Sequence, residues 1–190
     1  MLLNYLIQKF FTSCSDDLYI KIFKQSSNES NYSILVGDKV ISIEASNRYL
    51  IAGSEKGNII FYNKENIEKD DFIINDVFIN NSDSILNLDN KKILVGTKDG
   101  KITIIDIPFR KIINTIDAHD GPINCLIVNK DGSVFSTGED KYVNRWNIYN
   151  KHKLISFETK HKESVLQVLK LKTGFLATCS RDGFVLIYKY

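Results

Sequence analysis

Five segments of the chain carry the same order of apolar and polar positions and align without gaps. They are residues 13–23, 52–62, 95–105, 136–146 and 178–188. Their last residues are separated by 39, 43, 41 and 42 positions. Short apolar runs broken by polar turns are typical of β-strands. A regular period built from such runs predicts a repeating all-β fold.

Two columns of this alignment explain why each segment forms a hairpin. The third residue before the end is always β-branched, which suits a pleated strand between neighbouring sheets; these residues are Ile20, Ile59, Ile102, Val143 and Val185. The ninth residue before the end is always small, as a close approach of another backbone requires; these are Cys14, Gly53, Gly96, Thr137 and Cys179. Between the two runs, Asp99-Gly100 and Asp182-Gly183 supply the positive φ angles of a tight turn.

Further apolar runs on either side of the hairpins extend each unit to four strands. They are residues 2–7, 40–43, 85–88, 123–128 and 165–169 upstream, and 33–36, 72–74, 111–116 and 153–157 downstream. We therefore expect one all-β domain over residues 1–190, with repeats at about 1–36, 37–77, 78–117, 118–158 and 159–190. A period near forty residues predicts a β-propeller of about five four-stranded blades. The last blade lacks its outer strand, so the ring is expected to be open or incomplete.

Two units share a pattern of four residues: a His, a hydroxyl residue 17 positions later, an Asp 21 positions after the His, and an aromatic residue at the end. The residues are His119, Ser136, Asp140 and Trp146 in the fourth unit, and His161, Thr178, Asp182 and Tyr188 in the fifth. In this pattern the chain resembles the WD40 repeat family. The resemblance implies a structural network, in which the imidazole bonds a hydroxyl on the second strand and a carboxylate in the hairpin turn. The aromatic ring is expected to close that network.

A second interpretation of Ser136, His119 and Asp140 is a nucleophilic triad. Recurrence of the pattern in the fifth unit favours the structural network, because a catalytic triad has no reason to repeat. The first three units lack the His; the second has Lys56 where the Asp is expected, and the third keeps Asp99. We expect these three sheets to be held mainly by apolar packing and to be less rigid.

Composition narrows the range of functions. The chain has 43% hydrophobic and 25% charged residues and a net charge of +2, which gives no general attraction to nucleic acid or anionic membranes. Its three cysteines form no metal-ligand pattern and are expected to be reduced thiols: Cys14, Cys125 and Cys179. Phosphate-binding, metalloprotease and serine-hydrolase motifs are absent, so we expect no cofactor, no metal site and no enzyme. A start without signal-peptide features and the lack of a run of ~18 apolar residues favour a cytoplasmic or nuclear location.

Candidate binding residues lie on the loops that bear the His and the turn Asp. The resemblance implies that these loops share one rim, and their mixed charges favour a protein partner over a phosphate backbone. They are Asp120, Pro122, Glu139, Lys141, Lys162, Glu163 and Arg181. Arg145 is a further candidate because it interrupts an apolar column. The other interpretation of Arg145 is a locally paired or solvent-reaching side chain.

The expected function is a non-catalytic WD40-repeat scaffold or adaptor for protein–protein interactions in an intracellular complex. One alternative is an RNA- or ribonucleoprotein-associated subunit that uses basic residues of the last third, Lys151, Lys153, Lys160, Lys162, Lys170 and Lys172. Another is a fragment of a longer WD40 protein, and a third is a small propeller that closes on itself. A partner protein is expected to complete the fold at two exposed edges, from Leu2 to Ile7 and from Phe184 to Tyr188.

Overall fold

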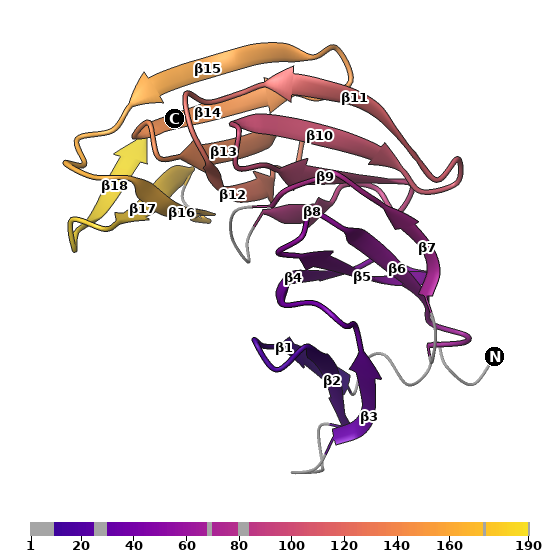
Figure 1. Cartoon of the computed structure of the whole chain (residues 1–190). Coiled ribbons are helices and arrows are strands. Elements are labelled where there is room, and N and C mark those ends of the chain that lie inside the picture. The colour runs from indigo at the N-terminus through magenta and orange to yellow at the C-terminus, as the bar shows by residue number, and fades with distance from the viewer. Residues whose placement is uncertain (1–9, 25–29, 68–69, 80–83, 173, 190) are drawn as a thin grey trace. The chain divides into compact units, whose positions relative to one another are not determined.

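The fold comes from a computed structural model, which describes residues 10–24, 30–67, 70–79, 84–172 and 174–189. These residues form 18 β-strands and no helix (Figure 1). All strand pairings are antiparallel and group the strands into five sheets of three or four. The all-β fold of repeated sheets is therefore confirmed. The chain divides into two compact units, Met1–Phe78 and Ile79–Tyr190, which we describe separately.

The first unit contains two sheets. Sheet I has the order β1-β2-β3, with strands Phe10–Cys14, Tyr19–Lys24 and Ser30–Leu35. Sheet II has the order β4-β5-β6-β7, with strands Val40–Ala45, Tyr49–Ser54, Ile59–Asn63 and Asp70–Ile74. Their facing surfaces form one core, in which Ile20 and Ile22 of sheet I pack with Leu50 and Ile60 of sheet II.

The second unit contains three sheets. Sheet III consists of β8 (Ile85–Asn87), β9 (Lys92–Gly96), β10 (Lys101–Asp106) and β11 (Lys111–Asp117). Sheet IV consists of β12 (Ile123–Val128), β13 (Val134–Gly138), β14 (Tyr142–Asn147) and β15 (His152–Glu158). Sheet V has three strands, β16 (Val165–Lys170), β17 (Phe175–Ser180) and β18 (Val185–Lys189).

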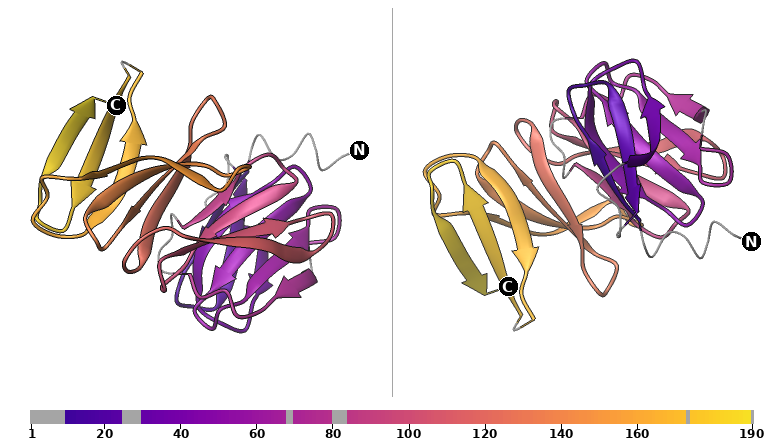
Figure 2. Two further views of the ribbon diagram at one scale, coloured as in Figure 1. Left: turned by 90° about the horizontal axis from the view of Figure 1, so that it is seen from above. Right: turned by 90° about the horizontal axis from the view of Figure 1, so that it is seen from below.

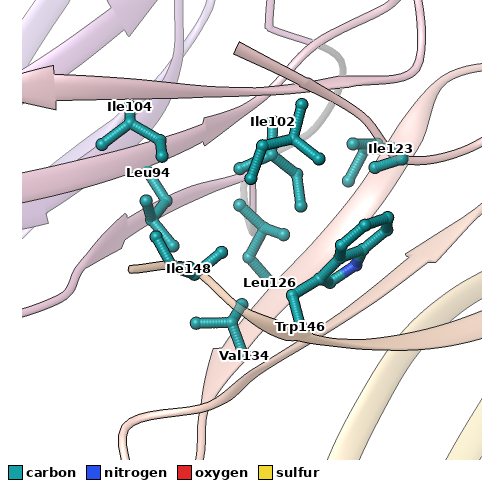
Figure 3. Close-up of a cluster of buried hydrophobic side chains, with 10 residues drawn as sticks. Leu94, Ile102, Ile104, Ile123, Leu126, Val134, Trp146 and Ile148 are labelled. Carbon is teal, nitrogen blue, oxygen red and sulfur yellow. The ribbon is translucent and has the colours of Figure 1, made fainter. Parts of the chain in front are cut away.

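Apolar side chains join neighbouring sheets in this unit. Leu94, Ile102 and Ile104 of sheet III pack with Val134 and Trp146 of sheet IV (Figure 3). The opposite face of sheet IV packs on sheet V, where Phe135 and Val143 meet Leu176. In both views of Figure 2, sheet V (yellow) lies beside sheet IV. Each sheet thus covers the next through the alternation of side chains along its strands.

The strands lie where the repeat places them. The runs at 123–128 and 165–169 are β12 and β16, and each of the five aligned segments spans two consecutive, paired strands of a sheet and the turn between them. The last sheet ends after its third strand, as expected. The expected strand from Leu2 to Ile7 lies outside the described residues. The boundaries of the single domain and its repeats stay a prediction.

The hairpin turns share one backbone conformation in all five sheets, although the residues at the turn differ. The sixth position of each aligned segment has a positive φ: Leu18 (69°), Gly57 (86°), Gly100 (79°), Lys141 (71°) and Gly183 (82°). Glycine adopts this conformation without strain, whereas a residue with a Cβ does not. The turn geometry is therefore kept in the two sheets where the sequence offers Leu or Lys instead.

Candidate functional site

The His119 array joins a loop, a strand and a turn at one end of sheet IV. His119 precedes β12, and its Nδ1 lies 2.9 Å from both carboxylate oxygens of Asp140, in the β13–β14 turn. Its Nε2 lies 2.7 Å from Ser136 Oγ on β13. Trp146 Nε1 on β14 donates to the same Oγ at 2.9 Å. Gly138 leaves room for the imidazole, because a Cβ there would lie 2.9 Å from the ring.

The His161 array repeats this arrangement in sheet V. His161 Nδ1 lies 3.2 and 3.1 Å from the two oxygens of Asp182, and Nε2 lies 2.8 Å from Thr178 Oγ1. Tyr188 takes a different place from Trp146. Its hydroxyl accepts a hydrogen bond from the backbone N–H of Lys160 at 2.8 Å, so it holds the loop that leads to His161.

Hydrogen-bond direction in the His119 array follows from the chemistry of its members. An ionised carboxylate only accepts, so His119 Nδ1 carries the proton that Asp140 receives. In the neutral imidazole, Nε2 then accepts from the Ser136 hydroxyl, which itself accepts from Trp146. All three bonds therefore point toward Asp140, and such chains of bonds polarise one another.

Electrostatics keep both turn carboxylates ionised. Burial raises the pKa of Asp140, but the hydrogen bond from His119, together with those from the backbone N–H groups of Tyr142 and Asp120, lowers it overall. Burial also raises the pKa of Asp182, but the N–H groups of Phe184 and Lys162 and the ring of His161 lower it to about 2. Each carboxylate thus ties its own turn to the preceding loop.

Ser136 is not placed like a nucleophile. Its side chain is fully buried, and its Oγ already bonds both His119 and Trp146. A nucleophilic hydroxyl must instead lie within reach of a substrate carbonyl. The geometry of this array fits a structural network.

Sheets without the His tie their turns in other ways, which sequence comparison missed. In sheet II, Asp38 comes from the loop before β4 and accepts hydrogen bonds from its own neighbour Lys39 at 2.8 Å and from the turn N–H of Lys56 at 3.0 Å. The carboxylate and the turn have exchanged places relative to sheet IV. In sheet III, Asp99 bonds Thr97 Oγ1 and pairs with Lys101 Nζ at 2.6 Å. A turn can therefore be held by hydrogen bonds even where the sheet has no His.

The rim candidates of sheets IV and V lie around these two arrays. Asp120 and Lys162 donate their backbone N–H groups to Asp140 and Asp182, at 3.1 and 2.8 Å. Glu139 donates its N–H to the carbonyl of Pro122 at 3.0 Å. The side chains of Asp120, Glu139, Lys162, Glu163 and Arg181 are exposed, whereas Pro122 and Lys141 are half-buried.

One ion pair links the rim residues of the two sheets. Arg181 Nη2 lies 3.7 Å from Glu139 Oε1, and both side chains are exposed. The two turns therefore stand side by side and present their charges on a common surface. We call the seven residues Asp120, Pro122, Glu139, Lys141, Lys162, Glu163 and Arg181 the rim surface.

Arg145 lies away from the rim surface, at the other end of sheet IV. Its Nη2 pairs with Asp131 and its Nε donates to Ser133 Oγ at 2.9 Å. Hydrogen bonds from the hydroxyl and N–H of Ser133, aided by Arg145, lower the pKa of Asp131 to about 2. The guanidinium also lies over the ring of Phe135, 5.6 Å from its centroid. This is the local pairing that the sequence left as one of two interpretations.

A polar pocket of about 210 Å³ lies beside the His119 array. Its lining comes from the β11–β12 loop, the β13–β14 turn and the strands β14 and β15: Asp117, Ala118, His119, Asp120, Asp140, Tyr142, Asn144, Lys153 and Ser156. Asn144 holds one wall in place by donating to the carbonyl of Ala118 at 2.8 Å.

The basic residues of the last third are only partly free for a ligand. Lys170 Nζ bonds Asn129 Oδ1, and Lys153 Nζ lies over the ring of Trp146, 5.0 Å from its centroid. The other four are exposed: Lys151, Lys160, Lys162 and Lys172.

Comparison with known proteins gives one family and several relatives. The family described as WD domain, G-beta repeat matches residues 110–147. WD repeat-containing protein 55 of Arabidopsis thaliana is 28% identical over 129 residues, 65% of this chain and 36% of that protein. Its Dictyostelium discoideum homolog is 30% identical over 103 residues, 54% of this chain and 25% of that protein. Autophagy-related protein 18 of Aspergillus fumigatus is 28% identical over 87 residues, 45% of this chain and 20% of that protein.

The matched regions thus cover little more than a third, or less, of these relatives' own lengths. Within the part of the chain that the structure describes, no helix is long and apolar enough to cross a membrane. The matched repeat holds all four members of the His119 array. Together with the five antiparallel sheets, this match supports the resemblance of the chain to the WD40-repeat family.

Proposed function

We propose that the chain is a non-catalytic scaffold or adaptor that binds a protein partner through the rim surface, within an intracellular complex of the cytoplasm or nucleus. WD40 repeats in general form protein-interaction scaffolds. The observation that carries the proposal is the pair of His arrays, which fix the two loops and two turns bearing the rim residues. Preorganised loops lose less conformational entropy on binding.

The chemistry of the rim surface supports a protein partner. It displays three acids and three bases close together. Glu139 and Arg181 form an exposed pair that a partner can exchange for its own ion pairs. Mixed charges of this kind give register and specificity at a protein interface. A phosphate backbone would instead require a stripe of positive charge.

A second binding element is the free edge of sheet V, where a partner segment would supply the fourth strand. The N–H of Ser180 donates to the carbonyl of Phe184, so in an antiparallel ladder the backbone groups of Val185 and Ile187 point to the open edge. Within the described residues, no strand pairs with that edge. Unpaired edges invite strand addition.

Affinity capture with the full chain tests the rim surface. We expect the wild type and Arg145→Leu to capture the same proteins from an extract of expressing cells. The double variant Glu139→Lys, Arg181→Glu reverses both charges and is expected to lose them at least tenfold, because it opposes every complementary charge of the partner. Capture that is equal for all three proteins, or no stable partner at all, would refute the rim surface as the binding site.

RNA binding is a separate outcome with its own signature. An affinity for single-stranded RNA that falls steeply with added salt, and that is lost in Lys160→Glu with Lys172→Glu, would replace the scaffold proposal with the nucleic-acid alternative. We expect no such binding, since Lys153 and Lys170 are engaged within the protein.

A further inference from the structure

Neighbouring sheets contact each other through the same two faces each time. We define the front face of a sheet as the face that bears the β-branched residue of the aligned segment. The back face is the opposite one. It bears the last residue of the segment and the residue paired with it on the preceding strand. In sheets I–II, III–IV and IV–V, a front face packs on the back face of the following sheet. The paired residues are Ile20 with Leu50, Ile102 with Val134, and Val143 with Leu176, all of them at most 4% exposed.

The front face of sheet V is open. Val185 occupies the β-branched column, yet it is 66% exposed where Ile20, Ile102 and Val143 are 0% exposed. Ile187 and Leu169 lie on the same face, aligned through Ala177, and are 64% and 62% exposed. This face belongs to the sheet seen in yellow at the C-terminal end in Figure 2. Within its own unit it is an apolar surface without the neighbour that the front faces of sheets I, III and IV have.

The back face of sheet I is open as well. Phe11 pairs with the last position of its segment, Phe23, and is 54% exposed where Leu50, Val134 and Leu176 are at most 4% exposed. The rings of Phe11 and Phe23 stack at 5.0 Å. Leu35, opposite Tyr19 on this face, is 61% exposed.

We propose that these two faces bind each other between two copies of the chain, front face of sheet V against back face of sheet I. Among the described residues, the first unit leaves a back face open and the second unit leaves a front face open. Three interfaces within the units show that the two kinds of face fit. Two different surfaces meet, so the contact is heterologous and joins copies head to tail. Neither face includes a rim residue, and the self-association goes beyond the scaffold function and stands independently of it.

Light scattering on the full chain after size-exclusion chromatography tests this pairing. The wild type is expected to rise above the monomer mass as its concentration increases. Val185→Glu and Phe11→Glu each place a charge on one face, and each is expected to remain monomeric at every concentration. An equimolar mixture of the two variants keeps one intact face of each kind, so it is expected to form a 1:1 dimer and nothing larger.

Four results would overturn the proposal. A wild type that stays monomeric shows that no second copy covers the faces. Association that is lost in only one of the two variants indicates contact between two like faces, and a mixture that stays monomeric although each variant alone abolishes association shows that one front-to-back contact does not join two copies. Loss of association in Phe109→Glu, a control at an exposed turn residue of sheet III, indicates a general effect of charge. Ile187→Lys serves as a second front-face variant, and circular dichroism spectra like that of the wild type verify folding.

Discussion

At the scale of single residues, the five turn positions have the same backbone conformation but different residue types. The backbone adopts a positive φ at all five, although only three of them are glycine. A side chain in this region costs roughly 1–2 kcal/mol. Leu18 and Lys141 therefore carry strain that the equivalent glycines avoid.

We expect Lys141→Gly to raise the free energy of unfolding by up to about 1 kcal/mol, because relief of strain exceeds the added freedom of the unfolded chain. Gly100→Ala is the matched control and is expected to lower it, since its φ is 79° and its Cβ would collide with the carbonyl of His119. Urea unfolding followed by tryptophan fluorescence measures both. Destabilisation by Lys141→Gly would show that the Lys side chain contributes more than the strain costs.

Asp182 makes the stability of sheet V depend on pH. Its pKa is about 2 in the folded chain, against about 4 in an unfolded one. A lowered carboxyl pKa stabilises the fold above the unfolded value, and this contribution is lost as pH falls from about 4 to about 2. We expect Asp182→Asn to be less stable than the wild type at pH 6, with a difference that shrinks across that window. A difference that is the same at pH 6 and pH 3, measured by urea unfolding, would contradict this.

At the scale of elements, the repeat predicts strands well and their irregularities poorly. The two strands of the hairpin in every sheet follow from the aligned apolar columns. The outer pairings, however, all contain a register shift just before the last position of the segment: at Ile22/Phe23, Phe61/Tyr62, Ile104/Ile105 and Arg145/Trp146. A bulge inserts one residue without changing composition. The sequence pattern alone therefore does not reveal it.

The repeat also predicts the part of the candidate site that recurs. The contact of His119 with Ser136 and Asp140 could be predicted because the same spacing recurs in the fifth unit. Asp38 was missed because its carboxylate comes from the loop and not from the turn. Arg145 had two interpretations because its partner Asp131 lies in a turn that is not part of the aligned segments.

Arg145→Leu tests the role of the β12–β13 turn. The ion pair with Asp131 is partly exposed, and such pairs contribute little, ~0–1 kcal/mol. The equivalent positions hold Ile22, Phe61 and Ile104. We expect the free energy of unfolding to change by less than about 1 kcal/mol and partner capture to be unchanged. Loss of capture with unchanged stability would make Arg145 a binding residue.

At the scale of the whole molecule, we expect the sheets whose turns are held by a His array to be more rigid than sheet I, whose turn has no such array. Sheets IV and V combine apolar cores with buried imidazole–carboxylate arrays. Sheet I packs through the core that it shares with sheet II, and its turn residue Asp17 bonds the exposed Lys21 and the backbone N–H of Tyr19. Local stability follows the number of buried contacts in a region.

We expect backbone amides of β2 in sheet I to exchange with deuterium faster than those of β14 in sheet IV. Hydrogen-exchange mass spectrometry at a concentration where the chain is monomeric measures this. His119→Ala should raise exchange in β14 and leave β2 unchanged, because the array lies entirely within the second unit. Equal protection of β2 and β14 in the wild type would show that apolar packing alone sets rigidity here.

The Gly100 turn has a consequence for the order in which the chain acquires structure during synthesis. Its carbonyl accepts the N–H groups of Ala118 and His119, both at 3.0 Å. These bonds need only residues up to His119, so they can form before Ser136, Asp140 and Trp146 have been added to the chain. Each later array then closes a loop of only 17 to 21 residues, which costs little chain entropy. Assembly of the second unit can thus proceed vectorially, with every finished sheet acting as the template for the histidine of the next.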